Sequence, residues 1–323
     1  MAGTIMKLLV VVIVGLLFLV PDTMQLSVNH PLHAVVERLN KVEGGGYLAL
    51  VISTAEDEIL LRNSSDYQPD FFNPFIIFAG RTFNFGTFKY QQVVHVLAGK
   101  PLSNVAATVQ MMIDLFPIKG IIDYGSAGTV SKEVIIADVV IPSQVAFTGV
   151  WSWEEPESKA RYPSLKIGEY NSPDAGNNSL GHITSLKTEV YEPTSISKTY
   201  FFDVHSEWLE IASRLNFGER PTVLLGEGYR CGSSDIYVSN SAYGTFLNKK
   251  LNITIVDTSS AAVVATSIAN GVPHIVIKGA SNRPGLNSTS KLSETTKKNV
   301  LKTVSTFVGG LYWQSEKTHA NVY

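Results

Sequence analysis

Four short polar segments, each following an apolar stretch, contain most of the side chains that could do chemistry. They are Glu56-Asp57-Glu58, Gly125-Ser126-Ala127-Gly128, Asp257-Thr258-Ser259 and Gly279-Ala280-Ser281-Asn282. A carboxylate turned inward from the first segment could orient a water or a substrate hydroxyl. The Gly-Ser-Ala-Gly segment lets the backbone approach a ligand closely and offers amides and a hydroxyl to an anion. These residue types indicate a small-molecule site.

The same residues also have an ordinary structural explanation. Ser, Thr and Asp cap helices, and acidic residues in a first helical turn complement the helix dipole. On the local pattern alone this structural explanation is favoured. The choice between a small-molecule site and ordinary helix caps therefore depends on the rest of the sequence.

The elements expected to position the last two segments form a strand–helix–strand pattern. Residues 253–256 are a β-branched run typical of a buried strand, and small apolar residues follow at helical spacing over 259–270. Gly271 and Pro273 end that helix, and 274–277 form a second apolar strand. This βαβ unit predicts parallel strands joined by a right-handed crossover. Ligands in such sheets bind beyond the carboxyl ends of the strands, so both polar segments should lie together.

The remaining chain predicts an α/β protein. Expected strands cover 47–53, 91–97, 118–124, 137–142 and 222–225, a hairpin covers 75–88, and helices cover 30–42, 103–116, 204–215, 237–250 and 294–311. The stretch at about 147–202 is rich in Trp, Pro, Ser and Asn and predicts a long insertion with little regular structure. We expect residues 24–323 to form one domain with this insertion.

Composition excludes several classes of site. The chain has 323 residues and a formal net charge of -2 with no basic run, which argues against nucleic acid as the main partner. Cys231 is the only cysteine and the seven histidines are scattered, so no disulfide framework or Cys-based metal site can form. We expect no metal and no cofactor, and a buried or partly buried thiol at Cys231.

The N-terminal residues 1–23 predict a signal peptide. Lys7 precedes an apolar run over 8–20, about 13 residues, which is short for a membrane span. An uncleaved anchor is the alternative. Four Asn-x-Ser/Thr sequons, at Asn63, Asn177, Asn252 and Asn287, fit a secretory route to an extracellular or vacuolar location. Asn252, at the start of an expected strand, is the least suited of the four to carry sugar.

The order of these motifs resembles the nucleoside phosphorylase family, which includes the 5′-methylthioadenosine nucleosidases. An acidic turn follows the first strand, GSAG follows a central strand, and V-D-x-x-S-A-A and V-x-K-x-x-S-N precede the last helix. With its signal peptide and insertion, the chain is most similar to the plant bark and vegetative storage protein branch. The resemblance implies a three-layer αβα sandwich around a mixed sheet, assembly as a homo-oligomer, and nucleoside or purine-base ligands. It also implies N-glycosidic bond cleavage with water or a phosphate co-substrate as nucleophile.

The resemblance also assigns residues. Glu58 matches the acidic residue that positions the attacking water, Ser126 and Gly128 match the turn beside nucleophile and ribose, and Tyr229 matches an aromatic residue against the base. Tyr229 could equally be a core aromatic. Asp257, Thr258 and Ser259 stand at the substrate-binding V-E-M-E motif, with Ser259 in place of the glutamate that holds the ribose hydroxyls. Asn282 stands in place of the aspartate that protonates the base.

The last two matches are departures that affect the chemistry. Ser259 offers a neutral hydroxyl where a carboxylate would form stronger, charge-assisted bonds, and the amide of Asn282 holds no transferable proton. For phosphate, Lys100 and Arg81 are the candidates, although Lys lacks the planar fork of Arg and Lys100 could be a solvated loop charge. The first hypothesis is a binding or storage protein with reduced or lost catalysis. The alternatives are an active nucleosidase or phosphorylase, and a membrane-tethered interaction protein.

Overall fold

The protein is built on one large mixed β-sheet. The computed structural model describes residues 26–42, 44–154, 182–286 and 290–320. Its eleven-stranded sheet has the order β12-β7-β13-β14-β6-β1-β5-β4-β2, with β15 against β6 and β7 and β3 against β4. The strands of this sheet are β1 Tyr47–Ile52, β2 Tyr67–Pro69, β3 Phe75–Phe78, β4 Arg81–Phe88, β5 Gln91–Leu97, β6 Ile118–Thr129, β7 Val139–Phe147, β12 Phe202–Asp203, β13 Val223–Ser233, β14 Ile255–Asp257 and β15 His274–Asn282.

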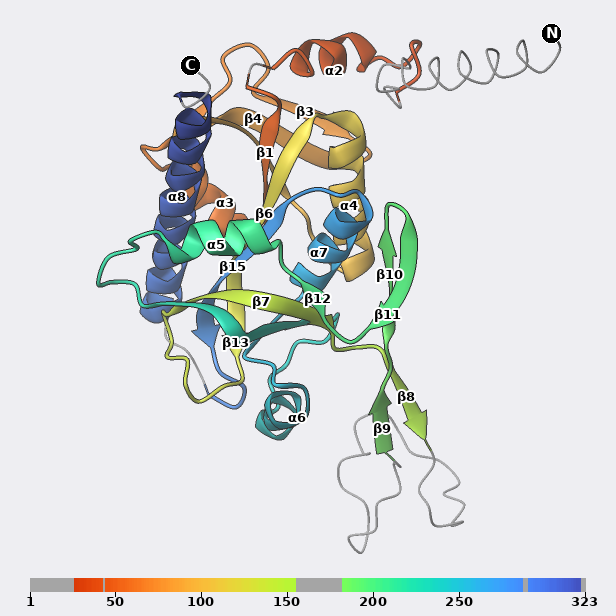
Figure 1. Ribbon diagram of the computed structural model, residues 1–323, viewed down its shortest axis with the longest axis vertical. Coiled ribbons are helices and arrows are strands. Elements are labelled where there is room, and N and C mark those ends of the chain that lie inside the picture. Colours follow the sequence, from red (N-terminus) through yellow and green to blue (C-terminus); the bar gives the residue numbers. More distant parts are fainter. Residues whose placement is uncertain (1–25, 43, 155–181, 287–289, 321–323) are drawn as a thin grey trace, which may run out of the picture.

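Helices cover both faces of the sheet because its central strands are apolar on both sides. In β1, Leu48 and Leu50 belong to one buried cluster and Ala49 and Val51 to another, as the two-residue period of a strand requires. The first cluster includes residues of α3, α5 and α8, and the second residues of α2 and α4. Figure 1 shows α8 and α4 on opposite sides of β1. The helices are α2 His33–Leu39, α3 Ala55–Arg62, α4 Leu102–Leu115, α5 Ser206–Ser213, α6 Ser241–Leu251, α7 Ser260–Ala269 and α8 Ser290–Ala320.

The three-layer αβα architecture is confirmed, but the predicted βαβ unit is wrong in its pairing. Strand β14 pairs antiparallel with β6 and parallel with β13, whereas β15 pairs parallel with β6. The two strands therefore meet through β6, the long strand between them, rather than as parallel neighbours. Their ends still lie together, because both pair with Gly128 near the end of β6.

The insertion contains more regular structure than expected. Its described parts form two antiparallel strand pairs, β8 Trp151–Glu154 with β9 His182–Ser185 and β10 Thr188–Glu192 with β11 Ser195–Thr199. Figure 1 shows β8 and β9 extending away from the main sheet. Residues 155–181 lie outside the described residues.

The N-terminal prediction and two sequons also fall outside the described residues, namely residues 1–23, Asn177 and Asn287. Asn63 and Asn252 are both exposed helix C-caps, of α3 and α6. The expectation that Asn252 begins a strand is wrong, since β14 begins three positions later at Ile255. None of the described helices is both long and apolar enough to cross a membrane.

Candidate functional site

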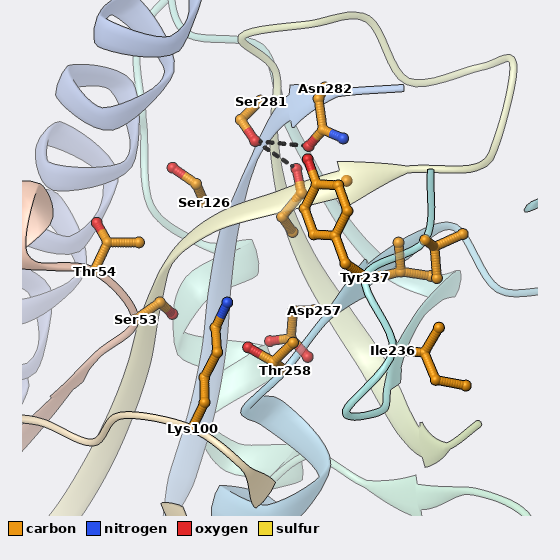
Figure 2. A pocket seen from close by; sticks show the side chains of 14 residues that line it. Ser53, Thr54, Lys100, Ser126, Ile236, Tyr237, Asp257, Thr258, Ser281 and Asn282 are labelled. Atoms are coloured by element: carbon orange, nitrogen blue, oxygen red, sulfur yellow. Dashed lines mark hydrogen bonds between the residues drawn. The ribbon is translucent and has the colours of Figure 1, made fainter. Parts of the chain in front are cut away.

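A cavity of about 200 Å³ lies where the ends of β1, β6, β14 and β15 meet. Figure 2 shows its polar side chains converging from these separate elements. We call it the strand-end cavity, and its lining residues are Ser53, Thr54, Lys100, Ser126, Ala127, Gly128, Ile236, Tyr237, Val238, Val256, Asp257, Thr258, Ser281 and Asn282.

Strand pairing brings the second, third and fourth polar segments of the sequence to this cavity. The register of β15 on β6 places Gly279 beside Ser126 and, after an irregularity, Asn282 beside Gly128. Val256 of β14 pairs with the same glycine. A Cβ atom added at Gly128 would lie 3.2 Å from Val256 Cγ2 and 3.5 Å from Asn282 Oδ1. The distance to Val256 is tighter than ordinary packing, so glycine at this position lets the Val256 side chain of β14 pack closely against β6, whereas the distance to Asn282 is an ordinary contact.

Several polar groups at the cavity have no partner within the described residues, among them those of Ser126, Thr258 and Lys100. Ser126 Oγ is buried and makes no hydrogen bond. The Thr258 hydroxyl and the Lys100 ammonium group likewise have none among the contacts of the described chain. A buried hydroxyl without a partner costs free energy, so Ser126 is suited to a ligand that supplies its hydrogen bond.

The Asn282 amide is oriented by its neighbour. Ser281 Oγ lies 3.1 Å from Asn282 Oδ1 and 3.1 Å from the Ala127 carbonyl oxygen. A serine hydroxyl has one proton, so it donates to only one of these acceptors at a time. If it donates to Ala127, the amide turns so that Nδ2 donates to Ser281 and Oδ1 faces the cavity. Asn282 can thus offer a ligand either a donor or an acceptor, but no acidic proton.

A buried charge cluster supports the wall of the cavity that Asp257 forms. Lys278 Nζ, whose side chain is fully buried, lies 2.9 Å from Asp123 Oδ1 and 3.2 Å from Asp257 Oδ2. It also donates to Ser53 Oγ at 2.8 Å and to Ser259 Oγ at 3.0 Å. Burial opposes charge on Lys278, but the two carboxylates raise its pKa above the usual value. Lys278 is therefore a fixed cation.

The two carboxyl groups of this cluster differ. Burial raises the pKa of Asp123, more than Lys278 lowers it. Burial also opposes ionisation of Asp257, but Lys278 and the Ser233 and Ser260 hydroxyls lower its pKa below the usual value. Asp257, the carboxyl group that faces the cavity, is therefore ionised at neutral pH and is no proton donor.

Ser259 lies behind the cavity wall. Its side chain is buried, and its hydroxyl lies 3.1 Å from Asp257 Oδ2 and 3.0 Å from Lys278 Nζ. Ser259 is the N-cap residue of α7, and its hydroxyl is engaged within the charge cluster, so its expected contact with a ribose stays a prediction.

Glu58, expected at the nucleophile, does not reach the cavity. Its carboxylate lies 3.0 Å from Arg62 Nη2 and 3.2 Å from Asn84 Nδ2, on the side of α3 that faces β4. The inward carboxylate of the acidic segment is Asp57, only 2% exposed, which accepts a hydrogen bond from the Thr54 hydroxyl at 2.6 Å. Burial raises the pKa of Asp57. Successive helical residues differ by about 100° in direction, so one position decides which side chain turns inward.

Tyr229 and Arg81 also lie away from the cavity. Tyr229 packs on the main apolar cluster within an irregular part of β13, and Tyr237 is the aromatic residue that lines the cavity. Arg81 donates to the Ala79 carbonyl, the Thr108 hydroxyl and Asn104 Oδ1. Those contacts tie β4 to α4, a structural role.

The main site residues that the sequence reasoning missed are Lys278, Asp123 and Tyr237. A lysine within the apolar run that forms β15 was the available signal for Lys278, because a charge in a buried strand needs a partner. Asp123, within the apolar run of β6, gave the same signal. Tyr237 comes from an irregular loop, for which spacing offers no guide. No group of three metal-ligating side chains occurs in the part of the chain that the structure describes.

Comparison with known proteins agrees with this fold. A family model described as Phosphorylase superfamily matches residues 48–312. The chain belongs to the phosphorylase superfamily. This superfamily member is 32% identical over 306 residues to bark storage protein A of Populus deltoides, which covers 90% of this chain and 96% of that protein. It is 26% identical over 210 residues to a 5′-methylthioadenosine/S-adenosylhomocysteine nucleosidase of Treponema pallidum (strain Nichols), covering 64% of this chain and 72% of that protein.

Solved structures show the same fold for this superfamily member. The futalosine hydrolase of Helicobacter pylori matches with a TM-score of 0.58 at 16% identity, covering 84% of this chain and 98% of that chain. A 5′-methylthioadenosine/S-adenosylhomocysteine nucleosidase from Neisseria meningitidis, in complex with methylthio-immucillin-A, matches with a TM-score of 0.58 at 18% identity, covering 81% and 98%. At these identities the likeness shows the shared architecture.

Proposed function

We propose that the strand-end cavity binds a purine base or nucleoside, and that cleavage of the N-glycosidic bond is reduced or lost. The observation that carries this proposal is the absence of an available acid at the cavity. Among the described lining residues the only carboxyl group is that of Asp257, whose pKa is lowered. Asn282, beside Gly128, can offer a hydrogen bond but no proton. Loss of a general acid typically costs about 10²–10⁴ in rate.

An active phosphorylase is the second candidate, because one side of the cavity suits an anion. Lys100 supplies a positive charge and Ser126 an unpartnered hydroxyl at the same cavity. A phosphate held there would be the nucleophile, and Asn282 would stabilise negative charge on the departing base by donating a hydrogen bond. Dependence of turnover on added phosphate distinguishes phosphorolysis from hydrolysis.

The test is turnover of adenosine, inosine and methylthioadenosine, followed by base release with and without phosphate. We expect no measurable turnover in the wild type. In Asn282→Asp, which restores a protonatable group, the turnover rate should be at least about 10²-fold above the detection limit. Asn282→Leu, similar in size but unable to hydrogen-bond, is the matched control and should stay silent. Wild-type turnover that Asn282→Leu abolishes would instead support the active phosphorylase or nucleosidase.

The proposal includes a secretory route, with residues 1–23 as a signal peptide, assembly as a homo-oligomer, and a storage role like that in the name of the Populus relatives. Uncleaved membrane anchoring remains the alternative for location. Mass spectrometry of the mature N-terminus separates cleavage from anchoring, light scattering gives the assembly, and abundance in the source tissue tests storage.

A further inference from the structure

We infer that the strand-end cavity prefers a free purine base to the corresponding nucleoside, an inference that rests on the proposed purine-binding function. Recognition of a ribose commonly uses an acidic side chain that accepts hydrogen bonds from its hydroxyls. Such charge-assisted bonds are roughly twice as strong as neutral ones. The question is therefore whether any carboxylate at this cavity has accepting capacity to spare.

The Asp257 carboxylate is already filled by donors of its own chain. Its Oδ1 accepts from Ser233 Oγ at 2.5 Å and from the backbone amides of Ser259 and Ser260, both at 3.3 Å. Its Oδ2 accepts from Ser259 Oγ at 3.1 Å and lies 3.2 Å from Lys278 Nζ. The single proton of Ser260 Oγ is shared between this oxygen at 2.5 Å and Asp123 Oδ2 at 2.7 Å. A carboxylate has about four lone-pair sites, so these donors leave none for a ligand.

The protons of the cluster can be assigned consistently with this conclusion. Lys278 donates its three protons to Asp123, Ser53 and Ser259, at 2.8–3.0 Å. Ser259, which accepts a hydrogen bond from Lys278, then donates its own single hydrogen bond to Asp257. Ser53 donates its hydrogen bond to the Tyr124 carbonyl oxygen at 3.1 Å. Neither Ser259 nor Ser53 keeps a free proton for a sugar.

The groups that remain free suit a base. The Asn282 amide can offer a donor or an acceptor, which is how asparagine pairs with the edge of a purine. Val256, Ile236 and Val238 supply apolar surface for the ring. The cavity volume of about 200 Å³ is below the range of roughly 300–1,000 Å³ typical of sites for larger ligands. The Thr258 and Ser126 hydroxyls could meet a ribose, but only with the weaker neutral bonds.

The test is isothermal titration of the full-length mature protein, in phosphate-free buffer, with adenine and hypoxanthine against adenosine and inosine. Chromatography after each titration checks that the nucleoside is intact. We expect the base to bind about tenfold more tightly than its nucleoside.

Thr258→Glu adds a free carboxylate at the cavity wall, and Thr258→Gln is the neutral control of equal size. Only Thr258→Glu should shift the preference toward the nucleoside, by about tenfold, equivalent to about 1.4 kcal/mol.

Each other result overturns the inference in a recognisable way. Tighter binding of the nucleoside by the wild type would refute it and leave the proposed purine-binding function intact. Failure of both base and nucleoside to bind would refute the function as well. Equal shifts in Thr258→Glu and Thr258→Gln would show that a missing carboxylate is not the cause of the preference.

Discussion

At the scale of single residues, the cavity depends on Lys278. This buried ammonium group holds Asp257, Ser259 and Ser53 in place, although it does not itself line the cavity. A buried ion pair adds little net stability compared with an apolar pair. Removal of one partner, however, leaves the other charge buried without a counter-charge. We therefore regard Lys278 as a positioning residue for the carboxylate wall.

Lys278→Met, which roughly preserves volume, should lower the free energy of unfolding by about 3–5 kcal/mol, because it leaves Asp257 and Asp123 buried without a counter-charge. Urea unfolding measures this. Lys298→Met is the matched control, since its partner Glu294 and Lys298 are both about 60% exposed, and exposed pairs contribute about 1 kcal/mol or less. Lys278→Met/Asp123→Asn should recover part of the loss. Equal, small effects of the two lysine substitutions would contradict the charge-cluster account.

At the scale of elements, the sequence predicted strands and helices better than it predicted where strands end. Apolar runs located β1, β5 and α4 within one or two residues. The Gly125–Gly128 segment was expected to be a turn, yet it lies inside β6, because β14 and β15 pair along it. Likewise β13 continues past Gly226 and Gly228, both at φ +94°, by means of an irregularity. Such continuations depend on partner strands distant in sequence, which local spacing cannot reveal.

The candidate site was predictable to a similar extent. Thr258 and Asn282 were placed together by the rule that ligands bind at strand ends, and Ser126 was added by the family resemblance. The structure puts all three at the cavity. Their roles stay predictions. The N-terminal cap, in which Thr54 and Asp57 bond to each other and turn Asp57 inward, was not anticipated from the sequence. A Thr three residues before an acidic residue was the signal for that cap.

The sheet edge formed by β2, β4 and β5 buries a histidine in its neutral form, which makes this edge sensitive to acid. His95 is fully buried, with Nε2 3.2 Å from the Tyr67 hydroxyl, and burial together with the charge of Arg62 lowers its pKa to about 3. Glu58 Oε1 is 3.5 Å from its Nδ1 but is already paired with Arg62. The histidine therefore stays neutral where an unfolded chain would protonate.

The unfolded chain binds this proton below about pH 6.5 and the folded protein does not until about pH 3, so stability falls as pH falls through that window. The expected slope from this residue is about 1.4 kcal/mol per pH unit. Urea unfolding of the wild type and His95→Gln between pH 7 and 4 measures it. The free energy of unfolding of the variant should change less steeply with pH, by the contribution of about one proton, or about 1.4 kcal/mol per pH unit. Identical slopes would mean that His95 is protonated in the folded protein.

At the scale of the whole molecule, one sheet joins the two largest apolar clusters of the described residues. Leu50 and Val51 are adjacent in β1 and fully buried, yet they pack into different clusters on opposite faces. Strand β1 thus contributes side chains to both clusters. Unfolding of this strand would expose the apolar side chains on both faces of the sheet. This sharing of one sheet favours the expectation that residues 24–323 form a single domain. The strand-end cavity lies at the ends of strands of the same sheet.

Truncation on either face should therefore weaken the same cooperative transition. Leu50→Ala should cost about 2–5 kcal/mol, and Val51→Ala, which removes fewer buried carbons, about 1–3 kcal/mol at roughly 0.8 kcal/mol per buried methylene plus the cavity left behind. Far-UV circular dichroism and tryptophan fluorescence, followed together through urea unfolding, should give coincident single transitions for both variants. Two separate transitions, with each substitution shifting only one of them, would show that the layers unfold independently and that the single-domain expectation is wrong.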